Sequence, residues 1–157
     1  MLLEAAVLTK QRDVARALAL TLGPVANTVL MAQNQTCIAR HLGAAAALLG
    51  EREKAKAYCQ QALEVCAKIR FRPEAALTRL QLAELLLEES DEVGRGDLAP
   101  TGMAPDVGVG SPDPKASADE IRKEALEHLD FAIAEFREMK MQPSLERALR
   151  HKEFLKA

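Results

Sequence analysis

The feature of this sequence that most constrains its fold is an internal repeat, in which position i matches position i+40. The segment LTKQRDVARAL at 8–18 matches LLGEREKAKAY at 48–58. The segment RHLGAAAALL at 40–49 matches LQLAELLLEE at 80–89 at the same offset. Self-similarity at such a period is the signature of stacked repeat architectures. Each period should therefore be one structural unit that buries its apolar face against the next unit.

The third copy of the repeat is interrupted after Ser90. The register resumes where IRFRP at 69–73 matches MKMQP at 139–143, at an offset of 70 that equals one period plus an insertion. Residues 90–118 hold five of the eight glycines and four of the seven prolines. Because such a stretch cannot bury enough apolar surface to offset its ordering entropy, we predict a flexible Gly/Pro-rich insertion there. Ser117 and Glu120 predict a capping box that restarts the helix.

Each period is expected to contain two antiparallel helices. Residues that favour helices dominate the chain, whereas aromatic residues make up 3% of it. Apolar residues recur at i, i+4, i+7, i+8 and i+11 in two matching stretches, which is the spacing of one helix face. These stretches contain Ala55, Cys59, Ala62, Leu63 and Cys66 in one copy and Ala125, Leu129, Ala132, Ile133 and Phe136 in the other.

Small residues and prolines add detail to this helical pattern. Gly43 and its counterpart Ala83 provide small side chains that let helices pack closely. Pro73 and Pro143 are each expected in the first turn of a helix, where a proline is tolerated. We therefore predict a single all-α domain over 1–157. It should be an α-solenoid of about three and a half antiparallel helix pairs with a right-handed superhelical bend.

The chain resembles tetratricopeptide repeat proteins, because five residues fall at the spacing of that signature: Leu42, Gly43, Gly50, Ala55 and Ala62. Its period is longer than the roughly 34 residues usual in that family. The segments IARHLGAAAALLGEREKAKAYCQQALEVC, RPEAALTRLQLAELLL and EALEHLDFAIAEFREMKMQPSLERAL also resemble the C-terminal helical region of large bacterial signalling ATPases. Those proteins are similar in plan to LuxR-type regulators and ATPase-linked adenylyl cyclases. The resemblance implies a signal-sensing or protein-binding region that is a fragment or relative of a larger bacterial signalling or transcription regulator.

The resemblance also implies a binding site. In tetratricopeptide arrays the first helix of each repeat lines a concave groove, which here gives three rows of side chains. The rows are Cys37, Leu77 and Arg147; Arg40, Leu80 and Arg150; and Ala44, Glu84 and Phe154. We expect the leucines to supply contact area for a protein or peptide partner, and Arg40 and Arg150 to orient its carboxylate or phosphate groups. The alternative is that these arginines are ordinary solubilising charge.

The three cysteines are expected to pack in the core. Together with His41 they have the ligand types of a zinc site, and a Cys–His pair is also the basis of thiol catalysis. However, Cys37 matches Leu77, Cys59 matches Leu129 and Cys66 matches Phe136, so each stands where another copy is apolar. We predict no metal, no cofactor, no catalytic residue and no enzymatic activity; a thiol-dependent enzyme using Cys37 or Cys59 is the weaker alternative. His41, Gln81 and His151 occupy equivalent positions, where we predict a solvated helix face; the alternative is a row of side chains that lines a shared surface.

Charge and hydropathy exclude two classes of partner. The formal net charge is −2 and the pI is near 6.0, so there is no basic footprint for nucleic acid. No apolar run approaches the roughly 20 residues that span a bilayer, and the N-terminus lacks the pattern of a secretory signal. Three cysteines that cannot all pair favour a reducing cytoplasm.

Both ends of the chain affect the expected function. Met1 aligns with His41, and 143–157 match only the first helix of a fourth repeat. We expect either a piece of a longer solenoid or a C-terminal capping helix. Apolar faces on terminal helices would also allow self-association, which is the second functional hypothesis.

Overall fold

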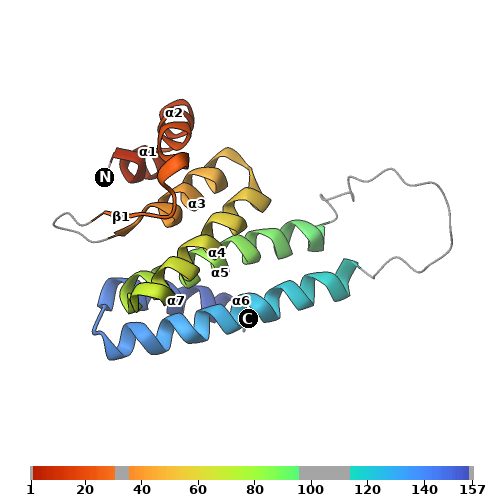
Figure 1. The fold of residues 1–157 in the computed structure, drawn as a ribbon. Coiled ribbons are helices and arrows are strands. Elements are labelled where there is room, and N and C mark those ends of the chain that lie inside the picture. Colours follow the sequence, from red (N-terminus) through yellow and green to blue (C-terminus); the bar gives the residue numbers. More distant parts are fainter. Residues whose placement is uncertain (1, 31–35, 96–113, 156–157) are drawn as a thin grey trace.

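The protein is mostly helical, which confirms the all-α class (Figure 1). The computed structural model describes residues 2–30, 36–95 and 114–155. Its helices are α1 (Leu2–Leu8), α2 (Arg12–Leu22), α3 (Ile38–Leu49), α4 (Arg52–Ile69), α5 (Arg72–Arg95), α6 (Pro114–Glu138) and α7 (Gln142–Phe154). A short 3₁₀ turn, η1 (Gly23–Val25), follows α2. The strands β1 (Val29–Leu30) and β2 (Thr36–Cys37) then pair antiparallel, with Val29 opposite Cys37.

Four of the turns between helices have the same backbone geometry. In each turn one residue adopts positive φ, and these residues are Lys10, Gly50, Arg70 and Lys140. In each, the N–H of that residue and the N–H of the next bond back to carbonyls of the preceding helix, which is the Schellman arrangement. The carbonyl of the following residue then accepts the first bond of the next helix, as Glu51 does from the N–H of Ala55. The helices therefore reverse direction within a very short connection.

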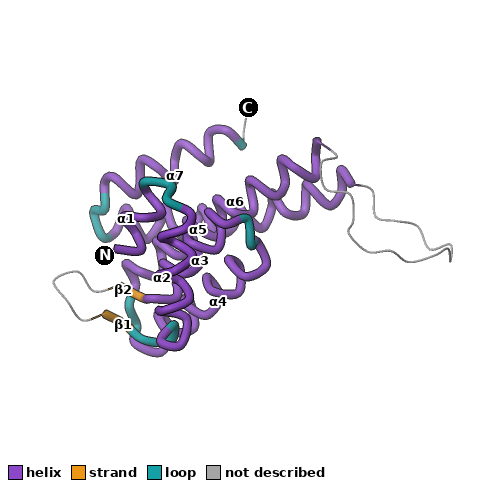
Figure 2. Tube along the Cα trace, turned by 90° about the horizontal axis from the view of Figure 1, so that it is seen from above, coloured by secondary structure: helices purple, strands orange, loops and turns teal. Residues whose placement is uncertain are grey.

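Consecutive helices pack against each other along the chain. Figure 1 shows the pairs stacked from α1 and α2 at the top, through α3 and α4, to α5 and α6 at the bottom. The odd-numbered helices also contact one another in sequence: α1 contacts α3, α3 contacts α5 and α5 contacts α7. Viewed from above, α7 runs along one side of the stack (Figure 2). The four helices α1, α3, α5 and α7 line the candidate site described below.

The core consists mainly of Ala, Leu and Cys side chains between these helices. Its largest fully buried side chains include Phe136 on α6 and Leu42 on α3. The crossing of α3 with α4 and α5 depends on Gly43. A Cβ added there would lie 3.0 Å from Gln81 Nε2, 3.1 Å from Cys59 Sγ and 3.3 Å from the carbonyl oxygen of Ala55. The predicted role of Gly43 in close helix packing is confirmed.

Two predictions about the insertion require correction. Ser90–Arg95 belong to α5, and α6 already begins at Pro114, so both helices extend into the predicted flexible segment 90–118. α5 is extended by ion pairs to α4, which join Arg52 to Glu92 and Lys56 to Glu89. The predicted capping box is wrong, because Ser117 lies inside α6. Proline favours the first position of a helix, which explains why α6 begins earlier. The remainder of the predicted insertion, 96–113, lies outside the described residues.

Candidate functional site

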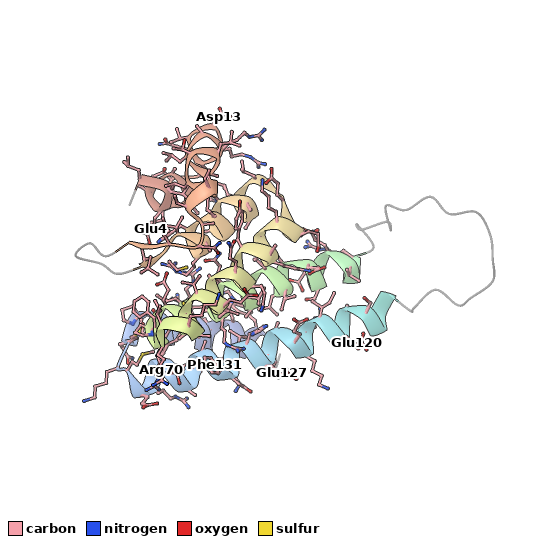
Figure 3. All side chains as sticks on the ribbon, in the orientation of Figure 1. Glu4, Asp13, Arg70, Glu120, Glu127 and Phe131 are labelled. Atoms are coloured by element: carbon pink, nitrogen blue, oxygen red, sulfur yellow. The ribbon has the colours of Figure 1, made fainter. Side chains whose placement is uncertain are left out.

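The candidate site is a groove of about 510 Å³ between α1, α3, α5 and α7. Its apolar lining is contributed by Val7, Leu8, Ala44, Ala47, Leu48, Leu77, Leu80 and Leu85. Its polar lining is contributed by Glu4, Lys10, Arg40, His41, Gln81, Glu84, Glu88 and Arg147. Glu4 on α1 is labelled in Figure 3. The groove therefore combines an apolar floor with charged groups of both signs.

The structure places most of the predicted groove residues together. Arg40, Leu77, Leu80, Glu84 and Arg147 all line the groove. Arg150 does not belong to the lining; it is exposed on α7. Of the other positions in the three rows, Ala44 lines the groove, Cys37 is fully buried, and Phe154 borders the adjoining cavity.

The groove continues past α7 into a second cavity of about 760 Å³. The two cavities share Glu84, Glu88 and Arg147. The second is further lined by Leu87, Asp91, Arg122, His151, Phe154 and Leu155. Together they form a trough along one face of α5 that is longer than either cavity.

Arg147 is already engaged by a carboxylate of the groove. Its Nε and Nη2 donate to the two oxygens of Glu84, at 2.6 and 2.7 Å. His151 Nε2 lies 3.0 Å from Glu84 Oε1. The Arg147 side chain is 60% exposed, so this pair contributes little to stability in water. The pair links α7 to α5, and the Nη1 donors of Arg147 are not used by Glu84.

Arg40 is engaged more deeply, by a buried carboxylate that the sequence did not point to. Glu74 at the start of α5 is 2% exposed. Its Oε1 accepts hydrogen bonds from Arg40 Nε at 2.8 Å, from the Thr36 hydroxyl at 2.7 Å and from the backbone N–H of Cys37 at 2.7 Å. Arg40 is predicted to bind a ligand through a free guanidinium. In the structure it is instead partly buried in an ion pair with Glu74.

Glu74 also caps α3 from another helix. Cys37 is the N-cap of α3 and its own side chain makes no capping bond. In a capping box, an acidic residue at the third helical position reaches back to the N-cap N–H. Arg40 occupies that position here, and it instead binds Glu74, whose carboxylate serves the N-cap. A negative charge at a helix N-terminus is favourable, so Glu74 stabilises α3 through space.

His41 completes this buried cluster, and the prediction that it lies on a solvated face is wrong. It is 3% exposed, and its Nε2 lies 2.8 Å from the Thr36 hydroxyl. The Thr36 hydroxyl also donates to Glu74 Oε1, and Arg40 Nη2 lies 3.4 Å from His41 Nε2. Burial and the neighbouring Arg40 lower the pKa of His41, which favours the neutral imidazole.

The three thiols are buried and poorly suited to nucleophilic chemistry. Cys37, Cys59 and Cys66 are each at most 2% exposed. Burial raises the pKa of Cys37, and it raises the pKa values of Cys59 and Cys66 to about 12. A nucleophilic cysteine needs the opposite shift. Within the described ranges, no three His, Cys, Asp or Glu side chains come close enough to hold a metal ion.

Glu74 is the main residue of the site that the sequence did not reveal. It follows Pro73 in the first turn of a helix, where acidic residues are common and usually exposed. The sequence places it one turn before Thr78, but only the structure shows that both side chains are buried. The sequence spacing alone does not reveal Glu74, because the side chains that bind it are 34 to 38 residues away in sequence.

Comparison with known proteins gives no relative: no family model, no curated protein and no solved structure matches this chain. Among the described helices, none is long and apolar enough to cross a membrane.

Proposed function

We propose that the chain is a helical-repeat interaction module that binds a segment of another protein in the groove between α1, α3, α5 and α7. The observation that carries the proposal is the groove itself, since one face of each alternate helix converges on a single trough with an apolar floor. Peptide-binding grooves on helical scaffolds have this composition, in which apolar anchors supply area and polar groups set orientation.

The packing supports a solenoid of antiparallel pairs of the tetratricopeptide kind. Turns with positive φ and the same hydrogen-bond pattern occur at Lys10 and Gly50, and again at Arg70 and Lys140, which are the pairs of positions that the sequence repeat matches. Contacts between alternate helices are also what a stacked array requires. The resemblance to bacterial signalling ATPases adds the expectation that the module works in the cytoplasm as part of, or alongside, a larger signalling or transcription regulator.

The groove's charges define how a partner binds. Arg40 and Arg147 are paired with Glu74 and Glu84, so the partner's main contacts are with exposed apolar groups. Leu8 on α1 is the most accessible of these, at 77% exposure. Burying such a side chain on binding contributes about 1.5 to 3 kcal/mol.

A matched pair of variants on α1 tests this proposal. Leu2 and Leu8 are equally exposed, but of the two only Leu8 lines the groove. Binders are first selected from a displayed peptide library against the intact chain. Leu8→Glu should weaken groove binders by roughly tenfold or more, the equivalent of about 1.4 kcal/mol, while Leu2→Glu should leave them unchanged. The proposal fails if selected peptides bind Leu8→Glu as well as the wild type.

Self-association is a second candidate function, favoured by the distribution of exposed apolar side chains. Of the eight large hydrophobic residues that are exposed among those described, five lie between Leu2 and Val25, on the first helix pair or directly after it. Phe154, at the other end of the described chain, is 81% exposed. Light scattering across a concentration series decides this candidate, because a chain that remains monomeric at high concentration excludes it.

A further inference from the structure

A third cavity lies between α2, α3 and α4, on the opposite face of α3 from the groove. Its volume is about 390 Å³, which falls in the range of small-molecule sites. Leu42, Ala46 and Leu49, spaced i, i+4 and i+7 on α3, form its apolar floor. The remaining lining residues are Arg16, Ala19, Leu20 and Gly23 on one side and Glu51, Lys54 and Tyr58 on the other.

The corresponding place in the next repeat is filled by the chain itself. At the repeat offset of 40, Ala46 corresponds to Leu86, and Leu86 is 3% exposed in the core. Leu49 corresponds to Glu89, and Arg16 corresponds to Lys56. In that repeat Lys56 Nζ lies 2.5 Å from Glu89 Oε2. In the next repeat, therefore, the side chains of Leu86 and Glu89 occupy the position that corresponds to the open cavity between α2, α3 and α4.

The open position has a cation without a partner among the described residues. Arg16 is exposed and forms no ion pair or hydrogen bond with any other described residue. Asp13, on the preceding turn of α2, lies at the outer edge of the molecule (Figure 3). Among the described residues, it forms no ion pair with Arg16. Lys54 pairs with Glu51 at 3.0 Å. Together these rim groups, Arg16, Lys54 and Glu51, have a net charge of one positive unit.

Tyr58 provides the other polar group of the cavity. Its ring packs against both of the larger core clusters. Its hydroxyl lies 4.0 Å from the position of a Cβ at Gly23, so it points across the cavity toward the end of α2. The hydroxyl makes no hydrogen bond with the other described residues, which leaves it available as a donor.

We propose that this cavity binds a medium-chain carboxylic acid. The apolar body of the ligand lies over Ala46, in the space that Leu86 fills one repeat later. Its carboxylate lies beside Arg16, in the position that Glu89 occupies beside Lys56. The ligand thereby supplies both groups that the sequence of α3 lacks relative to α5, and charge-assisted hydrogen bonds to the guanidinium fix its orientation.

The chain contains its own probe for this site. Tyr58 is the single tyrosine and there is no tryptophan, so all of the tyrosine emission comes from a residue that lines the cavity. Titration with octanoate should change this emission saturably. Octanamide, which has the same chain but no charge, should bind roughly tenfold more weakly, the difference expected of one charge-assisted contact.

Three variants assign the binding to the named groups. Arg16→Gln should make octanoate and octanamide bind equally. Ala46→Leu, which copies Leu86, and Leu49→Glu, which copies Glu89, should each abolish the emission change while circular dichroism remains helical. Arg150→Gln, an exposed arginine outside the cavity, is the control and should bind octanoate as the wild type does. The proposal is overturned if octanoate gives no saturable change, or if Arg16→Gln retains the preference for octanoate over octanamide.

Discussion

Glu74 joins α5 to the beginning of α3 through three hydrogen bonds to one oxygen. Glu74→Gln keeps an acceptor for the Cys37 N–H but leaves Arg40, whose side chain is 17% exposed, without a counter-charge. Because removing one partner of a buried ion pair leaves the other without a counter-charge, we expect a loss of about 3 kcal/mol in the free energy of unfolding. Urea denaturation followed by circular dichroism measures it.

The control for that prediction is Glu84→Gln, which breaks a pair with an exposed arginine. Its cost should be about 0.5 kcal/mol, since exposed pairs contribute little. Equal costs for the two variants would show that the Glu74 cluster has no special role in stability.

His41 makes the same cluster sensitive to acid. Its pKa is lowered in the folded protein, mainly by burial and also by Arg40, whereas the unfolded chain titrates near 6.5. The unfolded state therefore binds more protons as the pH falls below about 6.5, and stability decreases until the folded imidazole is also protonated. Above that pH His41 has no such effect. Glu4 on α1 and Glu74 on α5 oppose the shift without reversing it.

The measurement is the unfolding free energy as a function of pH, for the wild type and for His41→Gln. The variant should lose part of the decrease between about pH 6.5 and 5. His128, whose pKa is lowered by burial and by Arg79, should account for a separate part that remains in His41→Gln. If the two pH profiles are parallel, the assignment to His41 is wrong.

At the scale of helices, Gly43 tests how closely α3 must approach its neighbours. Gly43→Ala places a methyl group within 3.3 Å of three atoms, one of them a backbone oxygen that cannot easily move. Overpacking of this kind costs about 1 to 3 kcal/mol, which exceeds the helix propensity gained. Gly94→Ala in α5 meets nothing within 4 Å and should instead stabilise the protein by about 0.5 to 1 kcal/mol. Thermal unfolding of the two variants should therefore shift in opposite directions.

The helices also show what the sequence could and could not predict. Local signals placed Pro73 and Pro143 in the first turns of α5 and α7 and identified Gly43, because periodicity and backbone chemistry act over a few residues. The far end of α5 and the capping of α3 depend on Glu89 and Glu74, whose partners lie on other elements of the fold. The helix propensity of a glutamate is the same whether its side chain is solvated or paired with a buried arginine. These contacts follow only from the tertiary arrangement.

In the whole molecule, burial is unequal along the chain, and local stability should follow it. α5 contributes nine buried residues, from Glu74 to Ser90, whereas α7 contributes Ala148 alone and α2 contributes Ala15 alone. Helices with few buried contacts open at lower free energy than the global unfolding reaction. We therefore expect α7 and the first helix pair to exchange amide hydrogens first, and α4, α5 and α6 last.

Native-state hydrogen exchange with mass spectrometry checks this order. Arg147→Gln, which removes the bond from α7 to Glu84, should speed exchange in α7 while leaving that in α4 unchanged. Opening of α7 also affects binding, because α7 forms one wall of the groove. A partner that binds in the groove needs the conformation in which α7 packs against α5. A partner peptide should then slow exchange in α7 more than in α4. Uniform exchange across all helices would instead indicate that the stack opens as one cooperative unit, with α7 fixed as firmly as the core.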